Sequence, residues 1–222
     1  MNKLILFDID STLITAAKAW DTAFDNSLEE VYGIKTTCDI INHAGMTEKE
    51  ILLAVLKKEG FVEKEILCKM KEFEKVMTKT FDKLFVNEEI TILGGVEKLL
   101  DELKKKDILL GLVTGNTKPI SKTKLERTGI YHYFKVGGFA EDAIKRSDLV
   151  KIAIRRAEEL GFKHNKNVFL IGDSPWDVKA GREVNVVTIA VTTGSYTKED
   201  VKEADHIVEN LKDIEEILRI IK

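Results

Sequence analysis

The sequence predicts an α/β protein, namely a doubly wound parallel sheet with an inserted α-helical cap domain. Short apolar runs of strand length recur along the chain, and helical patterns lie between them, which is typical of strands joined by helical crossovers. One connection between strands is far longer than such a crossover requires, and this indicates an insertion.

Five apolar runs are predicted strands. Their apolar residues do not alternate with polar ones, as expected for parallel strands that are covered on both faces. Right-handed crossovers are expected between them. The runs are residues 4–7, 108–113, 134–136, 168–171 and 186–191.

Three helices are predicted between or after these strands. Residues 95–106 carry apolar side chains three and four positions apart. A second helix is expected to begin after Ser147 as its N-cap and to stop at Gly161. Residues 211–221 predict a last helix with the same apolar spacing.

About a hundred residues separate the first strand from the strand at 108–113. A crossover needs about a dozen, and the helix at 95–106 is sufficient for it. Three apolar stripes at helical spacing fill the remainder, which predicts a helical cap. We therefore assign residues 1–15 and 93–222 to the core and residues 16–92 to the cap.

The charge balance and the cysteine content exclude several classes of protein. With 35 Lys and Arg against 38 Asp and Glu, the net charge of −3 argues against a nucleic-acid-binding surface. Cys38 and Cys68 have no metal-binding spacing, and we expect free thiols inside the cap. No signal peptide or membrane span is recognised, so we predict a cytoplasmic protein without a membrane partner. The oligomeric state is unknown from the sequence.

Two aspartates follow the first predicted strand. A spacing of two places Asp8 and Asp10 on the same side, while Ile9 turns away. Neighbouring carboxylates repel each other, so the pair needs a shared proton or a divalent cation. Each aspartate alone would also fit a simple strand end or turn.

Polar groups also follow two other predicted strands. They are Thr114, Gly115 and Asn116 after one strand, and Asp173 with Asp177 after another. Ligands of open parallel sheets bind beyond the carboxyl ends of the strands, so we expect these groups to converge. Each group alone is also a good turn sequence, and their common placement favours a functional site.

Three segments together resemble the motifs of the haloacid dehalogenase superfamily of hydrolases. They are FDIDSTL at 7–13, LVTGN at 112–116 and IGDSPWD at 171–177, and their order matches over the whole Rossmann-like core. The insertion lies where that superfamily places a helical cap. The chain looks most like phosphoglycolate-phosphatase-like members, whose cap follows the first motif.

The resemblance implies Mg²⁺-dependent hydrolysis of a small phosphorylated metabolite, a phosphoglycolate-like phosphomonoester, through an aspartyl-phosphate. Asp8 would be the nucleophile, and Asp10 would be the general acid and then the general base. Asp8, the backbone carbonyl of Asp10, and Asp173 would hold Mg²⁺, with Asp177 acting directly or through water.

The resemblance also implies a set of phosphate-binding groups. The Thr114 hydroxyl and the amides around Gly115 and Asn116 would hold the phosphoryl oxygens. The family commonly adds a lysine that is followed by proline, and this chain has Lys145 and Arg146 without a proline. A variant pattern with arginine in similar phosphatases makes Arg146 the expected cation and Lys145 the alternative.

Two other functions stay open, while dehalogenation is disfavoured. Haloalkanoate dehalogenases of the same superfamily lack the second aspartate, and this chain has Asp10. A phosphomutase would differ little in sequence. A non-catalytic phosphate-binding regulatory protein would be marked by loss of Asp8, Asp10 or Asp173, and none is lost.

One polar segment interrupts the helical patterns of the cap. Thr47 is a predicted N-cap, with Glu50 at the capping-box position. In similar enzymes a loop like this contacts the leaving group of the substrate, so His43 and Thr47 are candidates for substrate specificity. The alternative is a simple helix–helix turn that needs Gly45 for its backbone conformation.

Overall fold

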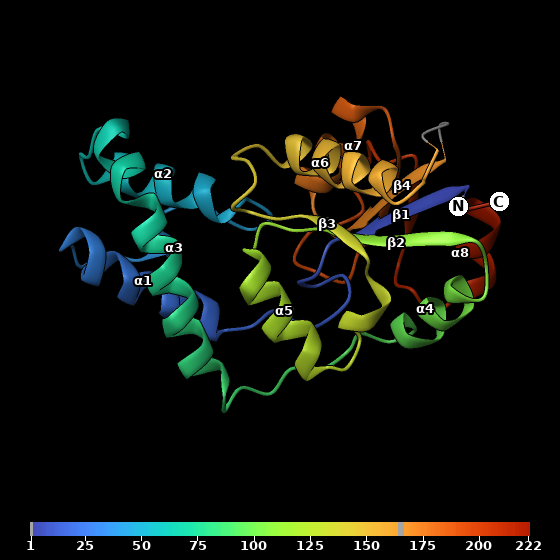
Figure 1. Ribbon diagram of the computed structural model, residues 1–222, viewed down its shortest axis with the longest axis horizontal. Coiled ribbons are helices and arrows are strands. Elements are labelled where there is room, and N and C mark those ends of the chain that lie inside the picture. Colours follow the sequence, from blue (N-terminus) through green and yellow to red (C-terminus); the bar gives the residue numbers. More distant parts are fainter. Residues whose placement is uncertain (1, 164–166) are drawn as a thin grey trace.

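The computed structural model describes residues 2–163 and 167–222, and these residues form a six-stranded parallel sheet at the centre of the core (Figure 1). The strands lie in the order β3-β2-β1-β4-β5-β6. The predicted doubly wound α/β fold is thereby confirmed. The strands are β1 (Lys3–Phe7), β2 (Ile108–Val113), β3 (Val136–Gly138), β4 (Val168–Gly172), β5 (Val187–Val191) and β6 (His206–Val208).

The register of the central strands brings three loops to one edge of the sheet. Phe7, the last residue of β1, pairs with Leu112 of β2 on one side and with Ile171 of β4 on the other. Because the strands are parallel, the segments that follow them leave the sheet at the same end. The three predicted motifs therefore start next to one another.

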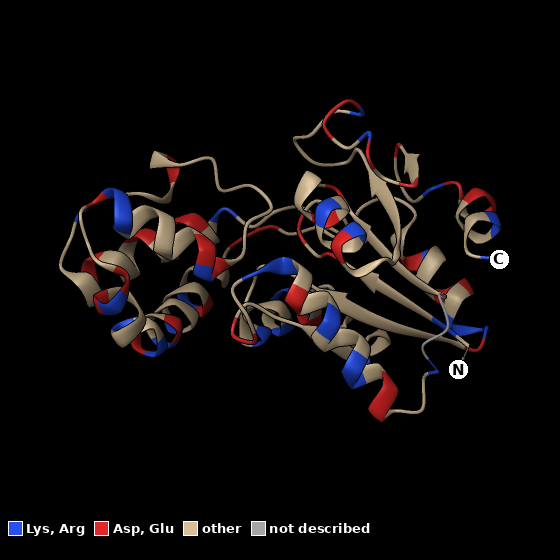
Figure 2. Ribbon diagram, turned by 90° about the horizontal axis from the view of Figure 1, so that it is seen from above, with Lys and Arg blue, Asp and Glu red and all other residues tan. Residues whose placement is uncertain are grey.

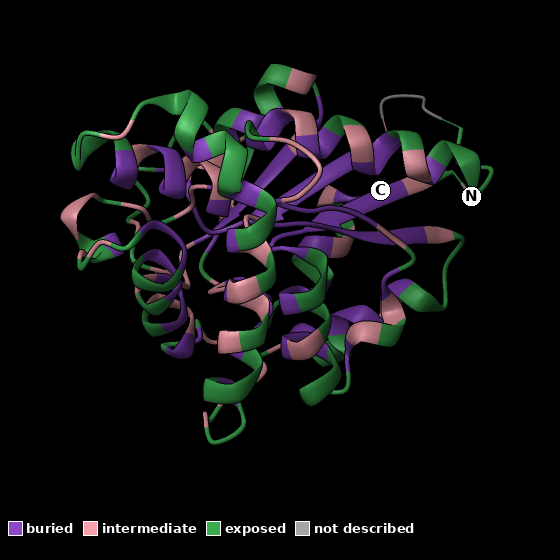
Figure 3. Ribbon diagram, turned by 60° about the vertical axis from the view of Figure 1, so that its left-hand side comes forward, coloured by how far each residue is buried: buried purple, intermediate pink, exposed green. Residues whose placement is uncertain are grey.

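Helices cover both faces of the sheet (Figure 1). Ile5 and Phe7 of β1 face one helical layer, while Leu4 and Leu6 face the other, and the strands are buried over most of their length (Figure 3). The first layer contains α4 (Val96–Lys104), α5 (Lys118–Arg127) and α8 (Ile214–Ile220), and the second contains α6 (Arg146–Glu159) and α7 (Pro175–Val184). Charged residues of both signs lie mainly along the helices and loops (Figure 2).

The inserted helices pack around a second apolar cluster, to one side of the sheet, which also includes Ile120 from the core (Figure 1). They are α1 (Ala19–Tyr32), the short 3₁₀ helix η1 (Cys38–Ile40), α2 (Glu48–Lys58) and α3 (Glu63–Phe85). The two connections to the core run side by side, because Ile14 forms an antiparallel bridge with Ile92. The boundaries of core and cap at residues 15/16 and 92/93 stay a prediction.

The third strand lies two residues later than predicted, and β6 was not predicted. Phe134 ends a 3₁₀ turn, η2 (Tyr131–Tyr133), and its ring packs edge-on against Phe7 with the centroids 6.1 Å apart. The strand itself contains two glycines, and a Cβ on Gly138 would lie 2.1 Å from the carbonyl oxygen of Leu149. Close packing of α6 thus requires glycine at position 138, and this glycine shortens the apolar run by which a strand is recognised.

Two helix starts also differ from the prediction. Ser147 is not an N-cap, because α6 begins at Arg146 and the carbonyl of Lys145 accepts the first backbone bonds. The last helix begins at Ile214, where the Asp213 side chain accepts from the amide of Glu216 at 3.0 Å. The local capping bond outweighs the apolar pattern that extended the predicted helix to residue 211.

The two cysteines occupy different environments. Cys38 is buried in the cap, as predicted, whereas Cys68 is exposed on α3, so its predicted burial was wrong. The apolar stripe of α3 runs through Ile66, Met70 and Phe73, and Cys68 lies outside it. Among the described residues, no helix is long and apolar enough to span a membrane.

Candidate active site

A cavity of about 270 Å³ lies between the carboxyl edge of the sheet and the cap. The loops after β1, β2 and β4 form its floor, and α1 with the loop before α2 forms the opposite wall. Residues from the core that line it include Asp8, Asp10 and Asp173, and residues from the cap include Trp20, His43 and Met46. The structure therefore brings the separate sequence motifs together.

Asp8 is a buried carboxylate directly after β1. Its amide donates to the carbonyl of Ile171 at 2.9 Å, which continues the ladder with β4 and fixes the direction of the side chain. Ile9 is fully buried, and Asp8 and Asp10 both line the cavity, as the spacing of two predicts. Burial, opposed by the nearby Arg146 guanidinium, raises the pKa of Asp8 well above its usual value.

Arg146 joins three parts of the site. Its Nη2 donates to Asp8 Oδ1, its Nε donates to Asp177 Oδ1 at 2.8 Å, and its Nη1 donates to the carbonyl of Gly45 at 3.0 Å. The side chain is buried, so these ion pairs are only weakly screened by solvent. Lys145, the alternative cation, is exposed at the N-cap of α6 and does not line the cavity.

Asp177 is held in place by the start of α7. Its Oδ2 accepts from the Ser174 hydroxyl at 2.6 Å and from the Ser174 amide at 3.2 Å, which completes a capping box. A Cβ on Gly172 would lie 2.2 Å from Asp177 Cγ, so this approach requires glycine. Asp177 thus orients Arg146 from a fixed position.

Asp173 follows β4 and faces the same cluster. Its Oδ1 accepts from the Thr12 hydroxyl at 3.3 Å. Burial, with the neighbouring Asp177 adding to it and Arg146 opposing it, raises the pKa of Asp173 to about 7. Burial beside another carboxylate therefore disfavours the charged form of Asp173.

The buried carboxylates fit a hard divalent cation. One oxygen each from Asp8, Asp173 and Asp177 lies within 4.8 Å of the others. Oxygen donors are the ligands that Mg²⁺ prefers, and a cation there would offset the burial of these charges. The donor set is consistent with the Mg²⁺ expected from the sequence.

A second cation in the site, Lys124, was not predicted. Its buried Nζ donates to Asp10 Oδ1 at 2.9 Å, to Asp10 Oδ2 at 2.8 Å and to Asn116 Oδ1 at 3.1 Å. Asn116 Nδ2 also donates to Asp10 Oδ2 at 2.7 Å. Asp10 is therefore fixed by two donors, and Lys124 lines the cavity beside it.

Thr114, Gly115 and Asn116 also line the cavity. The Thr114 hydroxyl accepts from the Asn116 amide at 3.2 Å and from Asn116 Nδ2 at 3.0 Å. The carbonyl of Gly115 accepts from the amide of Glu48 at 2.9 Å, so this loop also contacts the first residue of α2. The predicted segment thus joins core and cap.

Of the two residues predicted to contact the substrate, only His43 lines the cavity. His43 lines the cavity, and its ring stacks on Trp20 with the centroids 5.8 Å apart. Thr47 is buried as the N-cap of α2, with the predicted capping box to Glu50. Its hydroxyl donates to the carbonyl of Ile144 at 2.7 Å, and it does not line the cavity.

Core residues hold the loop that contains His43 above the cavity. The Tyr196 hydroxyl donates to the carbonyl of Ala44 at 2.9 Å, and Arg146 donates to that of Gly45. Gly45 has a φ of +82°, and a Cβ there would lie 2.5 Å from Cδ1 of Trp176. Glycine is therefore required both by the backbone conformation and by the close approach.

Residues 5–191 match the family described as haloacid dehalogenase-like hydrolase. The chain belongs to this family. The resemblance expected from the three motifs is thereby confirmed. In this haloacid dehalogenase-like hydrolase, the matched region includes the three motifs, the end of β1, the inserted helices and strands β2 to β5.

Individual relatives cover nearly the whole of this haloacid dehalogenase-like hydrolase. Pyrophosphatase PpaX of Oceanobacillus iheyensis is 26% identical over 218 residues, which are 96% of this chain and 94% of that protein. Phosphoglycolate phosphatase of Aquifex aeolicus is 25% identical over 205 residues, which are 88% of this chain and 87% of that protein. The crystal structure of a predicted phosphatase from Clostridium acetobutylicum shares the fold, with a TM-score of 0.73, 24% identity and 99% of each chain covered.

Proposed function

We propose that this protein is a Mg²⁺-dependent phosphomonoesterase that hydrolyses a small phosphorylated metabolite through an aspartyl-phosphate. The observation that carries the proposal is a buried carboxylate, Asp8, in one cavity with Asp10, Lys124, Arg146 and Asp173. Relatives named as a pyrophosphatase and as a phosphoglycolate phosphatase support a hydrolase that acts on phosphate esters.

Asp8 and Asp10 divide the chemistry in this proposal. A carboxylate oxygen of Asp8 attacks phosphorus, and the bond from phosphorus to the leaving alcohol breaks as Asp10 gives that oxygen a proton. Asp10 then takes a proton from water, which attacks phosphorus and breaks the bond to Asp8. Inorganic phosphate leaves, and both aspartates return to their starting states.

Two buried cations would stabilise the transferring group. Arg146 contacts Asp8 directly, so it lies beside the oxygen that would attack phosphorus. Lys124 contacts Asp10, on the side where the leaving oxygen would receive its proton. Thr114, Gly115 and Asn116 line the same cavity and would bind the remaining phosphoryl oxygens. Fixed charges and donors of this kind are often the largest contribution to catalysis.

Asp8 and Asp173, with the backbone carbonyl of Asp10, would hold Mg²⁺. When bound, the ion would neutralise phosphoryl oxygens as negative charge develops on them. Both carboxylate oxygens of Asp177 already accept hydrogen bonds, from Arg146 and from Ser174. We therefore propose that Asp177 supports the metal through water and orients Arg146.

The substrate is proposed to be small, with a phosphoglycolate-like phosphomonoester as the working example. A cavity of about 270 Å³ lies just below the range of ordinary ligand pockets. The cap wall offers Trp20, His43 and Met46 to the leaving group, and we propose His43 as its polar contact. Thr47 is not included, because its hydroxyl is already bonded.

A cytoplasmic location is part of the proposal, because free thiols are typical of reducing compartments.

A panel of phosphorylated metabolites tests the proposed function, with Mg²⁺ present or removed by a chelator. We expect release of inorganic phosphate that stops on chelation and returns with added Mg²⁺. Asp173→Asn should lower kcat/KM at least about 100-fold, because a lost metal contact weakens charge stabilisation worth several kcal/mol. Full activity in excess chelator would contradict the metal assignment. An isomeric phosphate ester formed without free phosphate would instead identify a phosphomutase.

His43→Ala should lower kcat/KM for the natural substrate by about 10- to 100-fold, because a hydrogen bond to a charged group contributes about 1.5–3 kcal/mol. Hydrolysis of a small aryl phosphate that lacks this contact should change little. The ratio of the two kcat/KM values is the measurement. Asn42→Ala, an exposed neighbour that does not line the cavity, is the matched control. An unchanged ratio in His43→Ala would mean that specificity lies elsewhere in the cap.

A further inference from the structure

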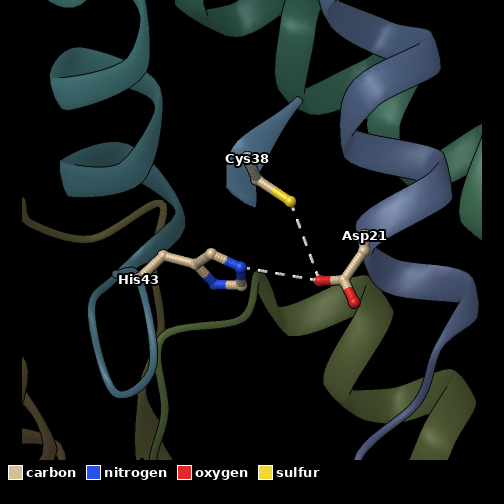
Figure 4. Close-up of side chains that lie close together, drawn as sticks. All are labelled: Asp21, Cys38 and His43. Atoms are coloured by element: carbon tan, nitrogen blue, oxygen red, sulfur yellow. Dashed lines mark hydrogen bonds and ion pairs between the residues drawn. The ribbon is translucent and has the colours of Figure 1, made fainter. Parts of the chain in front are cut away.

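Three potential metal ligands meet in the cap, and two of them, Asp21 and His43, line the cavity on the side opposite Asp8. Asp21 lies on α1, Cys38 begins η1, and His43 lies in the loop before α2. Figure 4 shows the Cys38 thiol and the His43 ring both directed toward the Asp21 carboxylate. Asp21 Oδ1 lies 3.8 Å from Cys38 Sγ and 3.9 Å from His43 Nε2. We refer to these three residues as the cap triad.

We propose that the cap triad binds a transition-metal ion of zinc type, at a site separate from the carboxylates of Asp8 and Asp173. The site would use one sulfur, one nitrogen and one oxygen ligand. The haloacid dehalogenase-like chemistry proposed above needs none of these three atoms as a metal ligand, so the inference goes beyond that function.

The spacing of the cap triad is close to that of a zinc site. Its three ligand atoms all lie within 4.8 Å of one another. Bonds of about 2.0–2.3 Å in a tetrahedral site place the ligand atoms about 3.3–3.8 Å apart. Small side-chain movements would therefore bring the triad to bonding distance. His43 lies in a loop and Asp21 is partly exposed, so both have room to move.

The types of donor distinguish this site from the one in the core. Thiolate and imidazole ligands suit Zn²⁺ and Co²⁺, whereas Mg²⁺ prefers oxygen alone. Asp39 Oδ1 lies 3.6 Å from His43 Nε2 but outside the group of three, so its exposed side chain would have to move closer to become a fourth ligand. An exposed carboxylate or water at that position would complete the tetrahedral set.

The charges around Cys38 also favour a cation. The Cys38 amide donates to Asp25 Oδ1 at 2.8 Å, Asp21 Oδ1 lies 3.8 Å from Cys38 Sγ, and Asp39 Oδ1 lies 3.6 Å from His43 Nε2. Burial, followed by the carboxylates of Asp25 and Asp21, raises the pKa of the Cys38 thiol. The thiol therefore keeps its proton in the absence of a metal. On binding, a sulfur–metal bond would form and the thiol proton would pass to solvent.

Metal at the triad would affect the cavity. His43 and Asp21 both line the cavity, so a bound ion would withdraw His43 Nε2 from the leaving group of the substrate. Zn²⁺ would then lower activity on the natural substrate while Mg²⁺ stays bound in the core. This consequence rests on the proposed function, but metal binding itself does not.

Cobalt titration of the reduced full-length protein tests the proposal independently of catalysis. Excess Mg²⁺ should be present, so that the oxygen-only site in the core is filled. We expect a thiolate-to-cobalt charge-transfer band together with strong visible bands of tetrahedral Co²⁺, all removed by one equivalent of Zn²⁺. Absence of the charge-transfer band in the wild-type protein would overturn the proposal.

Matched cysteine variants identify the sulfur ligand. Cys38→Ser should abolish the charge-transfer band, whereas Cys68→Ser, at the exposed cysteine outside the triad, should retain it. Survival of the band in Cys38→Ser, or its loss only in Cys68→Ser, would overturn the assignment.

His43→Gln alters a loop residue and leaves the buried thiol intact. It should weaken Co²⁺ binding at least about 100-fold, since even indirect partners of metal ligands contribute 10- to 100-fold. Unchanged affinity in His43→Gln would also overturn the site.

Discussion

Asp8→Asn should lower kcat by at least about 10⁴-fold, because the amide oxygen cannot replace the carboxylate as a nucleophile. The substitution preserves the shape of the side chain and leaves an oxygen that accepts from Arg146. The fold should therefore be retained, and the thermal midpoint should show this. Phosphate release under saturating substrate is the measurement.

The fall in kcat of Asp8→Asn needs a control with the same Asp-to-Asn change outside the active site. Asp200 is an exposed carboxylate that accepts from Thr197 in a turn outside the cavity. Asp200→Asn should leave kcat within about twofold of the wild-type value, as surface substitutions have small effects. Near-normal turnover in Asp8→Asn would show that another group attacks phosphorus.

Asp10→Asn should lower kcat/KM for alkyl phosphates by about 10²- to 10⁴-fold, the usual contribution of general acid–base catalysis. Aryl phosphates have better leaving groups and depend less on protonation by an acid. The rate of phosphoryl transfer from them to Asp8 should therefore fall far less. The amide of the variant keeps an oxygen for Lys124, which limits the structural disturbance. The measurement compares the two classes of ester in single-turnover experiments. Equal losses for both would indicate that Asp10 mainly positions other groups.

The sheet and the core motifs were predictable because their signals are local. Buried parallel strands leave unbroken apolar runs, and the polar residues that follow them meet at the carboxyl edge by topology alone. The sequence therefore predicts that Asp8, Asp10 and Asp173 converge, and all three line one cavity. The strand β3 was displaced in the prediction because close helix packing requires Gly138 there.

Lys124 could not be predicted, because its role depends on packing between distant segments. It lies 114 residues from Asp10, on a helix whose apolar contacts are limited to a few residues such as Ile120 and Leu125. Its aliphatic chain is buried beneath the cap, and its ammonium group lies 5.6 Å from the centroid of the Phe81 ring of α3. No spacing in the sequence indicates that contact.

The cap shows the same limit. The Thr47 capping box is a local pattern and is confirmed. The hydrogen bond from the Thr47 hydroxyl to the carbonyl of Ile144 joins distant segments and could not be predicted from the sequence. The cap triad is spread over two helices and a loop, and its spacing of 17 residues between Asp21 and Cys38 matches no metal motif. The packing of α1 against η1 brings Asp21 and Cys38 together, and the loop before α2 adds His43.

The stereochemical course at phosphorus tests the central claim most directly. A phosphorothioate substrate whose phosphorus carries sulfur and two different oxygen isotopes would be hydrolysed in water that carries the third isotope, and the configuration of the released inorganic thiophosphate would be determined. Two successive in-line displacements, first by Asp8 and then by water, predict net retention of configuration. Net inversion would mean a single attack by water, and it would contradict the aspartyl-phosphate.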